Sequence, residues 1–262
     1  MSIPLIFYLV LLGLTAGSLS GLLGIGGGVV IVPALVFVFG LSQHLAQGTT
    51  LALMVLPIGL LAAWTYYKNG HVDLRIAGLI CLGFTAGGYF GAVLATALSN
   101  AMLERVFAVA LMLVAFKMLT ASEPAPDASS TIQAATTKLH ITVPSALALM
   151  AVGLLVGLVS GLIGIGGGVL LVPVLVFYFG RSQHEAQGTT LALMVPPVGL
   201  LAACEYYHKG DVNLTIAALI CAGFFVGGLI GARLATRLSS RLLGKVFGVS
   251  MILIALKMLL GA

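Results

Sequence analysis

Charged residues are scarce in this chain: they make up 7% of its 262 residues, whereas 60% are hydrophobic. No Asp, Glu, Lys or Arg precedes Lys68. Long uncharged apolar runs are typical of bilayer-spanning segments, so the composition excludes an ordinary soluble domain and predicts a polytopic membrane protein. The first residues lack the positive flank and cleavage site of a secretory signal, and we expect the N-terminal segment to be retained as a span.

The few charged residues and cysteines argue against several other classes of protein. The formal net charge is +5, but the basic residues are scattered between apolar stretches, which indicates topology signals and contact with lipid, and no nucleic-acid partner. Cys81, Cys204 and Cys221 lack the spacing of a metal site. No nucleophile with a base and an orienting carboxylate can be assembled from the apolar segments. We therefore expect neither an enzyme nor a bound metal or cofactor.

The chain is internally duplicated. Residues 14–119 align with residues 154–259 without a gap, and about three fifths of the aligned positions are identical. A Ser-, Thr- and Pro-containing stretch at 121–139 has the composition of a flexible linker. We predict an N-terminal membrane repeat at 1–120 and a C-terminal membrane repeat at 140–262.

Hydropathy divides each repeat into five apolar segments. We expect helices at 4–23, 28–40, 44–66, 74–98 and 102–119, with counterparts at 142–163, 168–180, 184–206, 214–238 and 242–260. The second segment of each repeat is short for a span of about 20 residues, and whether it crosses or returns as one arm of a re-entrant hairpin stays open. Either way each repeat makes an odd number of crossings. The predicted fold is therefore all-α, with two inverted-topology repeats.

The distribution of positive charge favours the same inversion. Lys and Arg prefer cytoplasmic loops. In the first repeat the loop at 68–75 carries the excess of positive charge, whereas in the second repeat the excess lies at 233–245, in a different loop. This switch between the copies places both regions on the cytoplasmic side.

A glycine-rich interruption follows the first segment of each repeat, in the runs at 20–28 and 160–168. Such backbone is tolerated at membrane depth where protein covers it or where it lines a cavity, and the first turn of the helix that follows presents free amides that attract anions. We predict that these amides hold an anionic substrate. The predicted residues are Gly26, Gly27, Gly28, Gly166, Gly167 and Gly168. The alternative is that these glycines only permit close helix packing.

Other glycines have a pattern typical of helix contact. Gly83, Gly87 and Gly91 recur at every fourth position, as do their counterparts at 223, 227 and 231, and so line one helical face.

A polar motif, Gln-Gly-Thr-Thr, opens the third segment of each repeat at 47–50 and 187–190. Facing the interior of a bundle, it could hydrogen-bond an oxyanion. The candidate binding residues are Gln47, Thr49, Thr50, Gln187, Thr189 and Thr190. In the alternative, Ser42 and Ser182 cap the helix and the threonines bond back to their own carbonyls.

Two further residue types in this segment occur at equivalent positions of the repeats. His44 and His184 are candidates for proton-linked transport, or else interfacial hydrogen-bonding residues. Pro57 and Pro197 are expected to kink the segment, as a hinge or as a fixed bend.

In this order the motifs resemble the TauE/SafE family of membrane transporters. The motifs are the glycine run, then Pro33 or Pro173, then Gln-Gly-Thr-Thr-Leu-Ala at 47–52 and 187–192. The resemblance covers nearly the whole chain. The resemblance implies export of sulfite or an organosulfonate such as sulfoacetate across the bacterial cytoplasmic (inner) membrane. An interior without carboxylates also favours a small anion as the passenger. We expect alternating access; a passive anion channel and a non-transporting membrane scaffold subunit are the alternatives.

Overall fold

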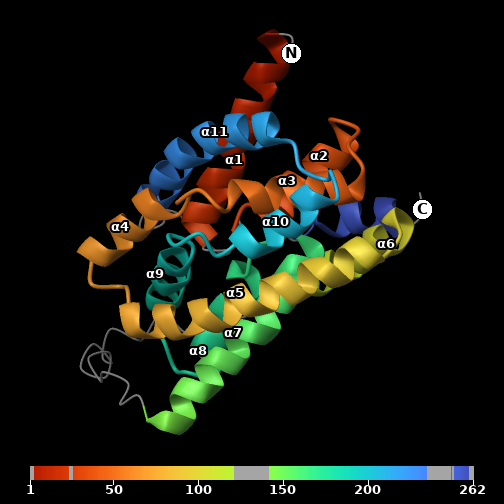
Figure 1. The fold of residues 1–262 in the computed structure, drawn as a ribbon. Helices are drawn as coiled ribbons and strands as arrows, with labels where there is room; N and C mark the ends of the chain where they lie inside the picture. The colour runs from red at the N-terminus through yellow and green to blue at the C-terminus, as the bar shows by residue number, and fades with distance from the viewer. Residues whose placement is uncertain (1–2, 24–25, 121–141, 235–248, 250, 260–262) are drawn as a thin grey trace.

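The computed structural model describes residues 3–23, 26–120, 142–234, 249 and 251–259, and the predicted linker at 121–139 lies outside them. All regular secondary structure in these residues is helical (Figure 1). Four of the described helices are long and apolar enough to cross a membrane: α1 (Ile3–Leu23), α5 (Leu74–Ala97), α7 (Val143–Ile163) and α11 (Leu214–Leu234). The predicted all-helical membrane protein is confirmed.

A short helix follows each glycine run. α2 (Gly28–Phe37) and α8 (Gly168–Phe177) have 10 residues each, which makes about 15 Å of helix, half of the hydrocarbon thickness of a bilayer. Each is followed by a turn and then by a helix that packs against it, α3 (Gln43–Leu53) or α9 (Gln183–Leu193). Each repeat therefore contains a helical hairpin whose arms are too short to span a bilayer alone.

The third predicted segment of each repeat is two helices and not one kinked helix. α4 (Leu60–Lys68) follows α3 after a non-helical stretch, as α10 (Leu200–His208) follows α9. The prediction of continuous helices at 44–66 and 184–206 is therefore wrong. Pro57 has no N–H to offer the carbonyl of Leu53, which accepts from the N–H of Leu56 at 3.2 Å instead, and the helix ends there.

The last segment of each repeat is helical where it is described. α6 (Asn100–Thr120) agrees with the expected 102–119. In the second repeat, residues 251–259 are helical within the expected 242–260.

The long helices form two pairs, each with one helix from each repeat: α1 with α11, and α5 with α7. Glycines line both contacts. An added Cβ at Gly87 of α5 would overlap the carbonyl oxygen of Leu154 in α7, and one at Gly227 of α11 would overlap that of Leu14 in α1. The predicted helix-contact role of this glycine pattern is confirmed.

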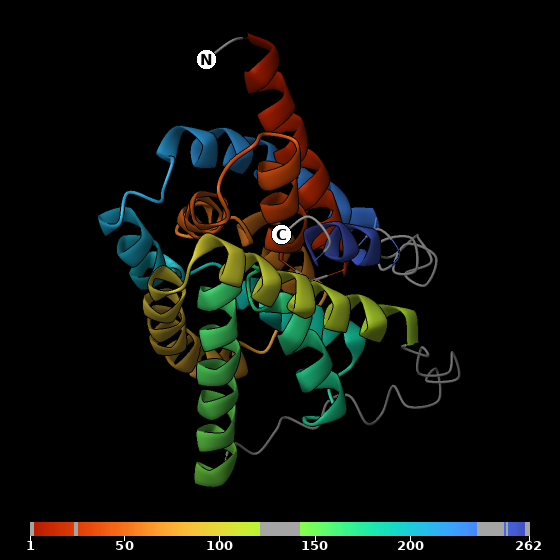
Figure 2. The ribbon, with the colours of Figure 1, turned by 90° about the vertical axis from the view of Figure 1, so that its right-hand side faces the viewer.

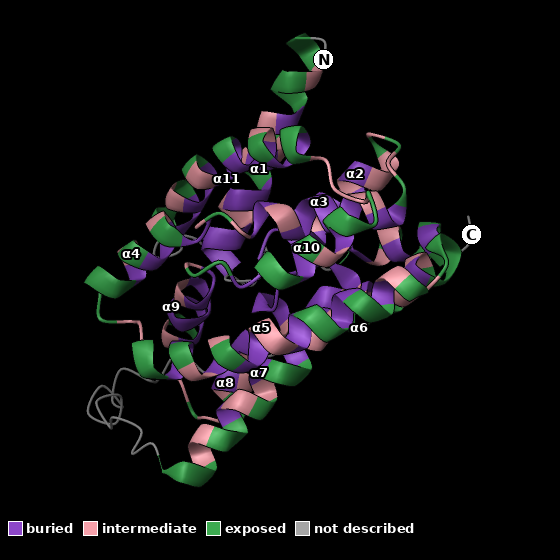
Figure 3. Cartoon of the chain, in the orientation of Figure 1, coloured by how far each residue is buried: buried purple, intermediate pink, exposed green. Residues whose placement is uncertain are grey.

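The first helices of the two repeats run in opposite directions. α1 descends from the N-terminus, whereas α7 rises from the opposite end of the molecule in both views (Figures 1 and 2). This arrangement is compatible with inverted repeats. Large apolar side chains such as Leu82, Phe90 and Leu113 are exposed, while buried residues gather in the interior (Figure 3). Lipid is a suitable environment for such an exterior.

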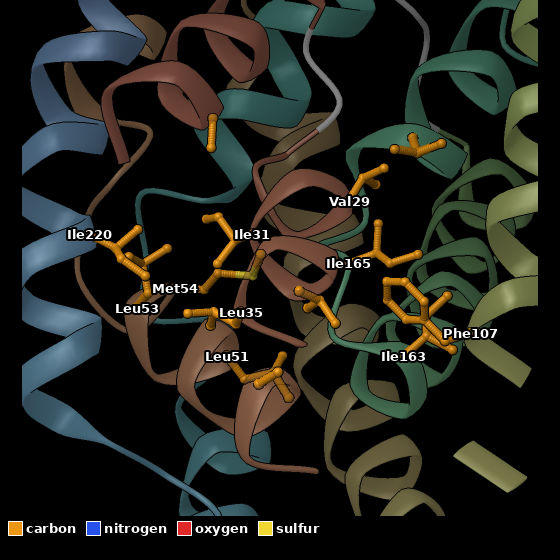
Figure 4. Close-up of a cluster of buried hydrophobic side chains, with 14 of the residues drawn as sticks. Val29, Ile31, Leu35, Leu51, Leu53, Met54, Phe107, Ile163, Ile165 and Ile220 are labelled. Carbon is orange, nitrogen blue, oxygen red and sulfur yellow. The ribbon is translucent and has the colours of Figure 1, made fainter. Parts of the chain in front are cut away.

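The hydrophobic core between the helix pairs draws on both repeats. Val29 and Ile31 of α2 belong to one buried cluster with Phe107 of α6 and with Ile163 and Ile165 of the second repeat (Figure 4). The core therefore joins the two repeats around the glycine-rich interruptions.

Candidate functional site

The two glycine-rich interruptions meet at the interface between the repeats. Gly26 and Gly166 have positive φ angles of 74° and 73°, in the left-handed region that favours glycine. A Cβ at Gly26 would lie 3.3 Å from the carbonyl oxygen of Ile165, and one at Gly28 would overlap the carbonyl oxygen of Gly164. The two backbones are thus in direct contact. We call residues 26–28 and 164–168, all of them buried, the glycine crossing.

Two helices begin at the glycine crossing. Gly27 and Gly167 are the N-caps of α2 and α8, and no side chain caps either helix. Uncapped N-termini present free N–H groups and the positive end of the helix dipole, an environment that suits an anion. Each N-cap also lies beneath an aromatic ring, because a Cβ at Gly27 would overlap the ring of Phe224 and one at Gly167 the ring of Phe84.

The proline interruption of each repeat contacts the helix that precedes the proline interruption of the other repeat. A Cβ at Gly59 would lie 2.7 Å from the carbonyl oxygen of Leu191, and one at Gly199 would lie 2.9 Å from that of Leu51. The sequence indicated a kink at each proline, but it did not indicate that these segments contact the opposite repeat. The signal that could have indicated this contact is the glycine two residues after the proline, Gly59 after Pro57, which the second repeat reproduces.

Two methionines connect the proline interruptions to the glycine crossing. Met54 and Met194 are the C-caps of α3 and α9. The methyl carbon of Met54 lies 2.6 Å from the position of a Cβ at Gly166, and that of Met194 lies 3.1 Å from one at Gly26. Four interrupted stretches, from both repeats, therefore converge in one buried region.

The predicted glutamines lie beside the glycine crossing. The Cβ of Gln47 is 3.0 Å from the position of a Cβ at Gly164. The Nε2 of Gln187 donates to the carbonyl oxygen of Leu23, the last residue of α1, at 3.3 Å. Both glutamines are almost fully buried. The Nε2 of Gln47 has no hydrogen-bond partner among the described residues.

A tyrosine from the opposite repeat holds each glutamine. The hydroxyl of Tyr206 donates to Oε1 of Gln47, and the hydroxyl of Tyr66 donates to Oε1 of Gln187, each at 3.1 Å. Sequence reasoning missed both tyrosines. Their equivalent positions in the two repeats, each as the first residue of a Tyr-Tyr pair, were the available signal.

Thr49 and Thr189 reach the opposite repeat in a different way. The Oγ1 of Thr49 accepts from the backbone N–H of Asn213 at 3.0 Å, and the Oγ1 of Thr189 accepts from that of Asp73 at 3.1 Å. Asn213 and Asp73 directly precede α11 and α5. These two hydroxyls therefore anchor the beginnings of two long helices, and their predicted contact with substrate stays a prediction.

The second threonine of each motif differs between the copies. The hydroxyl of Thr50 donates to the carbonyl oxygen of Ala46 at 2.7 Å, as the alternative interpretation expected. The hydroxyl of Thr190 is buried and has no partner among the described residues. Ser42 and Ser182 cap α3 and α9.

The histidines lie at the beginning of the same helices. His44 is buried, with Nδ1 2.6 Å from Oδ1 of Asn100 and Nε2 3.1 Å from the carbonyl oxygen of Ala95. His184 is exposed, and its ring centroid is 5.5 Å from that of His71. His184 lies outside the four candidate spans. The pKa of its ring is lowered by partial loss of hydration and, to a smaller extent, by the nearby charge of His71. A role of either histidine in proton-linked transport stays a prediction.

One ion pair breaks the symmetry of the site. Arg181, between α8 and α9, lies 3.6 Å from a carboxylate oxygen of Asp73. The equivalent residues are Leu41 and Asn213, so both partners differ in the other copy. The two half-sites therefore differ in charge at these positions.

These features define a multi-pass α-helical membrane protein whose duplicated halves bring their interrupted helices together. Residues 9–258 match the family described as Sulfite exporter TauE/SafE. The chain belongs to this family of membrane transporters.

Similar proteins occur in bacteria and in an archaeon. A "Probable membrane transporter protein" of Xylella fastidiosa is 33% identical over 215 residues, which cover 81% of this chain and 78% of that protein. One of Bacillus subtilis is 27% identical over 233 residues, covering 84% and 85%. One of Methanocaldococcus jannaschii is 26% identical over 178 residues, covering 64% and 60%. No solved structure matches the chain.

Proposed function

We propose that this protein exports a small sulfur oxyanion or organosulfonate, such as sulfite or sulfoacetate, across the cytoplasmic membrane of a bacterium by alternating access. The passenger binds at the glycine crossing. Sulfur oxyanions are negatively charged and carry several acceptor oxygens, which match a set of N–H and side-chain donors. The family description names sulfite, and that name supports the choice of passenger.

The observation that carries this proposal is the meeting of the two interruptions. The uncapped N-termini of α2 and α8 come from different repeats and both begin at the glycine crossing. The two dipoles together favour a negative charge at the glycine crossing, whose residues 26–28 and 164–168 include no arginine or lysine. Moderate binding by neutral donors lets the passenger leave again, which a carrier requires.

Gln47 and Gln187 add side-chain donors at the same place. Their oxygens are occupied by tyrosine hydroxyls, so the amide nitrogens are the groups that face other partners. The unpartnered Nε2 of Gln47 supports a role as a donor to the passenger. Tyr66 and Tyr206 fix the orientation of these amides and link each to the opposite repeat.

The glycine crossing is closed in this structure, since Gly26–Gly28 and Gly164–Gly168 are buried. A passenger therefore enters only when the interrupted segments move. Discontinuous helices at an interface between inverted repeats suit alternating exposure to the two sides, because one half can rock against the other around a fixed site.

Transport by the purified protein in liposomes tests the proposal. Flux of sulfite, sulfoacetate, taurine, thiosulfate and sulfate would be measured with and without a pH gradient. We expect saturable movement of sulfite or an organosulfonate that is accelerated by the same anion on the opposite side. Currents without such counterflow would identify a channel. Liposomes that move none of these anions would contradict export altogether.

A further inference from the structure

Two small cavities flank the glycine crossing. The first is lined by residues that include Ser160, Gly166 and Met54. The second is lined by residues that include Ser20 and Gly59. Met194 lines both cavities and so lies between them. The first cavity is about the size of one water molecule and the second is smaller than a water molecule, so both must widen before an oxyanion can enter.

The cavities are copies of each other. Every residue of the second has its counterpart, 140 positions away in the alignment of the repeats, among the residues of the first. The pairs include Ser20 with Ser160 and Met194 with Met54. The paired lining positions carry the same residue in both repeats except Ile58 and Val198, so the duplicated sequence builds the same geometry twice.

Each cavity contains a buried hydroxyl without a partner. Ser20 is 1% exposed and Ser160 is 3% exposed, and neither Oγ has a hydrogen-bond partner among the described residues. A hydroxyl in a helix can donate to the carbonyl one turn earlier, as Thr15 does to Leu11 at 3.1 Å. The two serines forgo this bond. Because an unsatisfied buried hydroxyl costs free energy, both hydroxyls indicate a polar guest.

The tyrosine network reaches both cavities. The hydroxyl of Tyr66 lies 3.4 Å from the carbonyl oxygen of Gly21, and that of Tyr206 lies 3.4 Å from that of Gly161. Gly21 and Gly161 are themselves lining residues. Each cavity is thereby connected through a tyrosine to one of the site glutamines.

Methionine separates the two cavities. Met54 and Met194 are buried, and their methyl groups press on the glycines of the crossing. Methionine has three rotatable bonds and adapts easily to a changed cavity. Both side chains can therefore adapt when the interrupted segments move and the cavities widen.

From this geometry we propose that the Oγ of Ser20 and the Oγ of Ser160 each bind an oxygen of the transported oxyanion, in two equivalent half-sites with Met194 between them. This inference rests on the proposed function and adds two substrate-binding residues to it.

Serine-to-alanine variants test the half-sites. Ser20→Ala and Ser160→Ala remove one oxygen each, and alanine has the higher helix propensity, so folding is retained. A hydrogen bond to an anion contributes enough for its loss to raise KM for sulfite about tenfold in each single variant. The double variant should also lose the thermal stabilisation that sulfite gives to the wild-type protein in detergent.

Ser18→Ala is the matched control, because Ser18 lies on the same helix and its counterpart in the second repeat is Leu158. Its KM should equal that of the wild type. Unchanged KM and unchanged stabilisation by sulfite in the double serine variant would overturn the half-sites while leaving export intact. If the wild-type protein neither transports nor is stabilised by any anion of the panel, the proposed function fails and the half-sites with it.

Discussion

Gly87→Ala combined with Gly227→Ala is expected to lower the thermal unfolding temperature of the purified protein sharply and to reduce its monodisperse yield. In each case the new methyl group would overlap a backbone carbonyl oxygen of the paired helix, Leu154 in α7 or Leu14 in α1. A backbone atom cannot rotate away, so both helix pairs must separate. Overpacking costs about 1–3 kcal/mol per site, and two sites consume a large part of a typical stability.

Gly78→Ala on α5 is the control for this prediction. Nothing lies within 4 Å of a Cβ at Gly78, and the second repeat carries Ala218 at the equivalent position. This variant should unfold at or above the wild-type temperature, because alanine is the better helix former. A double variant as stable as Gly78→Ala would show that the glycine contacts do not hold the long helices together.

Gln47→Ala combined with Gln187→Ala is expected to reduce the rate of sulfite efflux from proteoliposomes by about 100-fold or more. The double variant removes the two side-chain amides beside the glycine crossing. Each hydrogen bond to a charged passenger contributes about 1.5–3 kcal/mol, and every 1.4 kcal/mol corresponds to a factor of ten. The rate would be measured at equal amounts of reconstituted protein.

Two controls separate binding from folding in this experiment. Gln183→Ala changes an exposed glutamine on α9 and should leave efflux unchanged. Tyr66→Phe with Tyr206→Phe removes the hydroxyls that orient the glutamine amides but keeps the amide donors, so it should reduce efflux less than the glutamine double variant does. Efflux at the wild-type rate in the glutamine double variant would refute the role of these amides.

Local signals in the sequence predicted where the helices after the glycine runs begin. The runs that end at Gly28 and Gly168 give the start of α2 and α8 to the residue, because glycine at positive φ and a change of helix are encoded within a few positions. The role of the contact glycines such as Gly87 could also be predicted from neighbouring residues, since a spacing of four residues places them on one helical face.

The break at each proline and the hydrogen bonds of the polar motif depend on residues far apart in the chain. A proline in an apolar segment is compatible with a kink or with a full break. At Pro57 the break is accommodated by Gly59, which packs on the carbonyl of Leu191 in the other repeat. The hydroxyl of Thr49 likewise bonds to Asn213, 164 positions away. Only the fold brings these partners together, so the spacing of the polar motif could not assign their roles.

Protection of engineered thiols by the passenger tests the central claim most directly, namely that the anion occupies the region where the interruptions meet. Met54→Cys and Met194→Cys would be made separately, each with Cys81→Ala and Cys221→Ala, and labelled with a thiol-specific methanethiosulfonate reagent. The exposed native Cys204 serves as an internal reference. We predict that saturating sulfoacetate slows labelling at positions 54 and 194 but not at Cys204. Equal labelling rates at both positions with and without sulfoacetate would contradict the account.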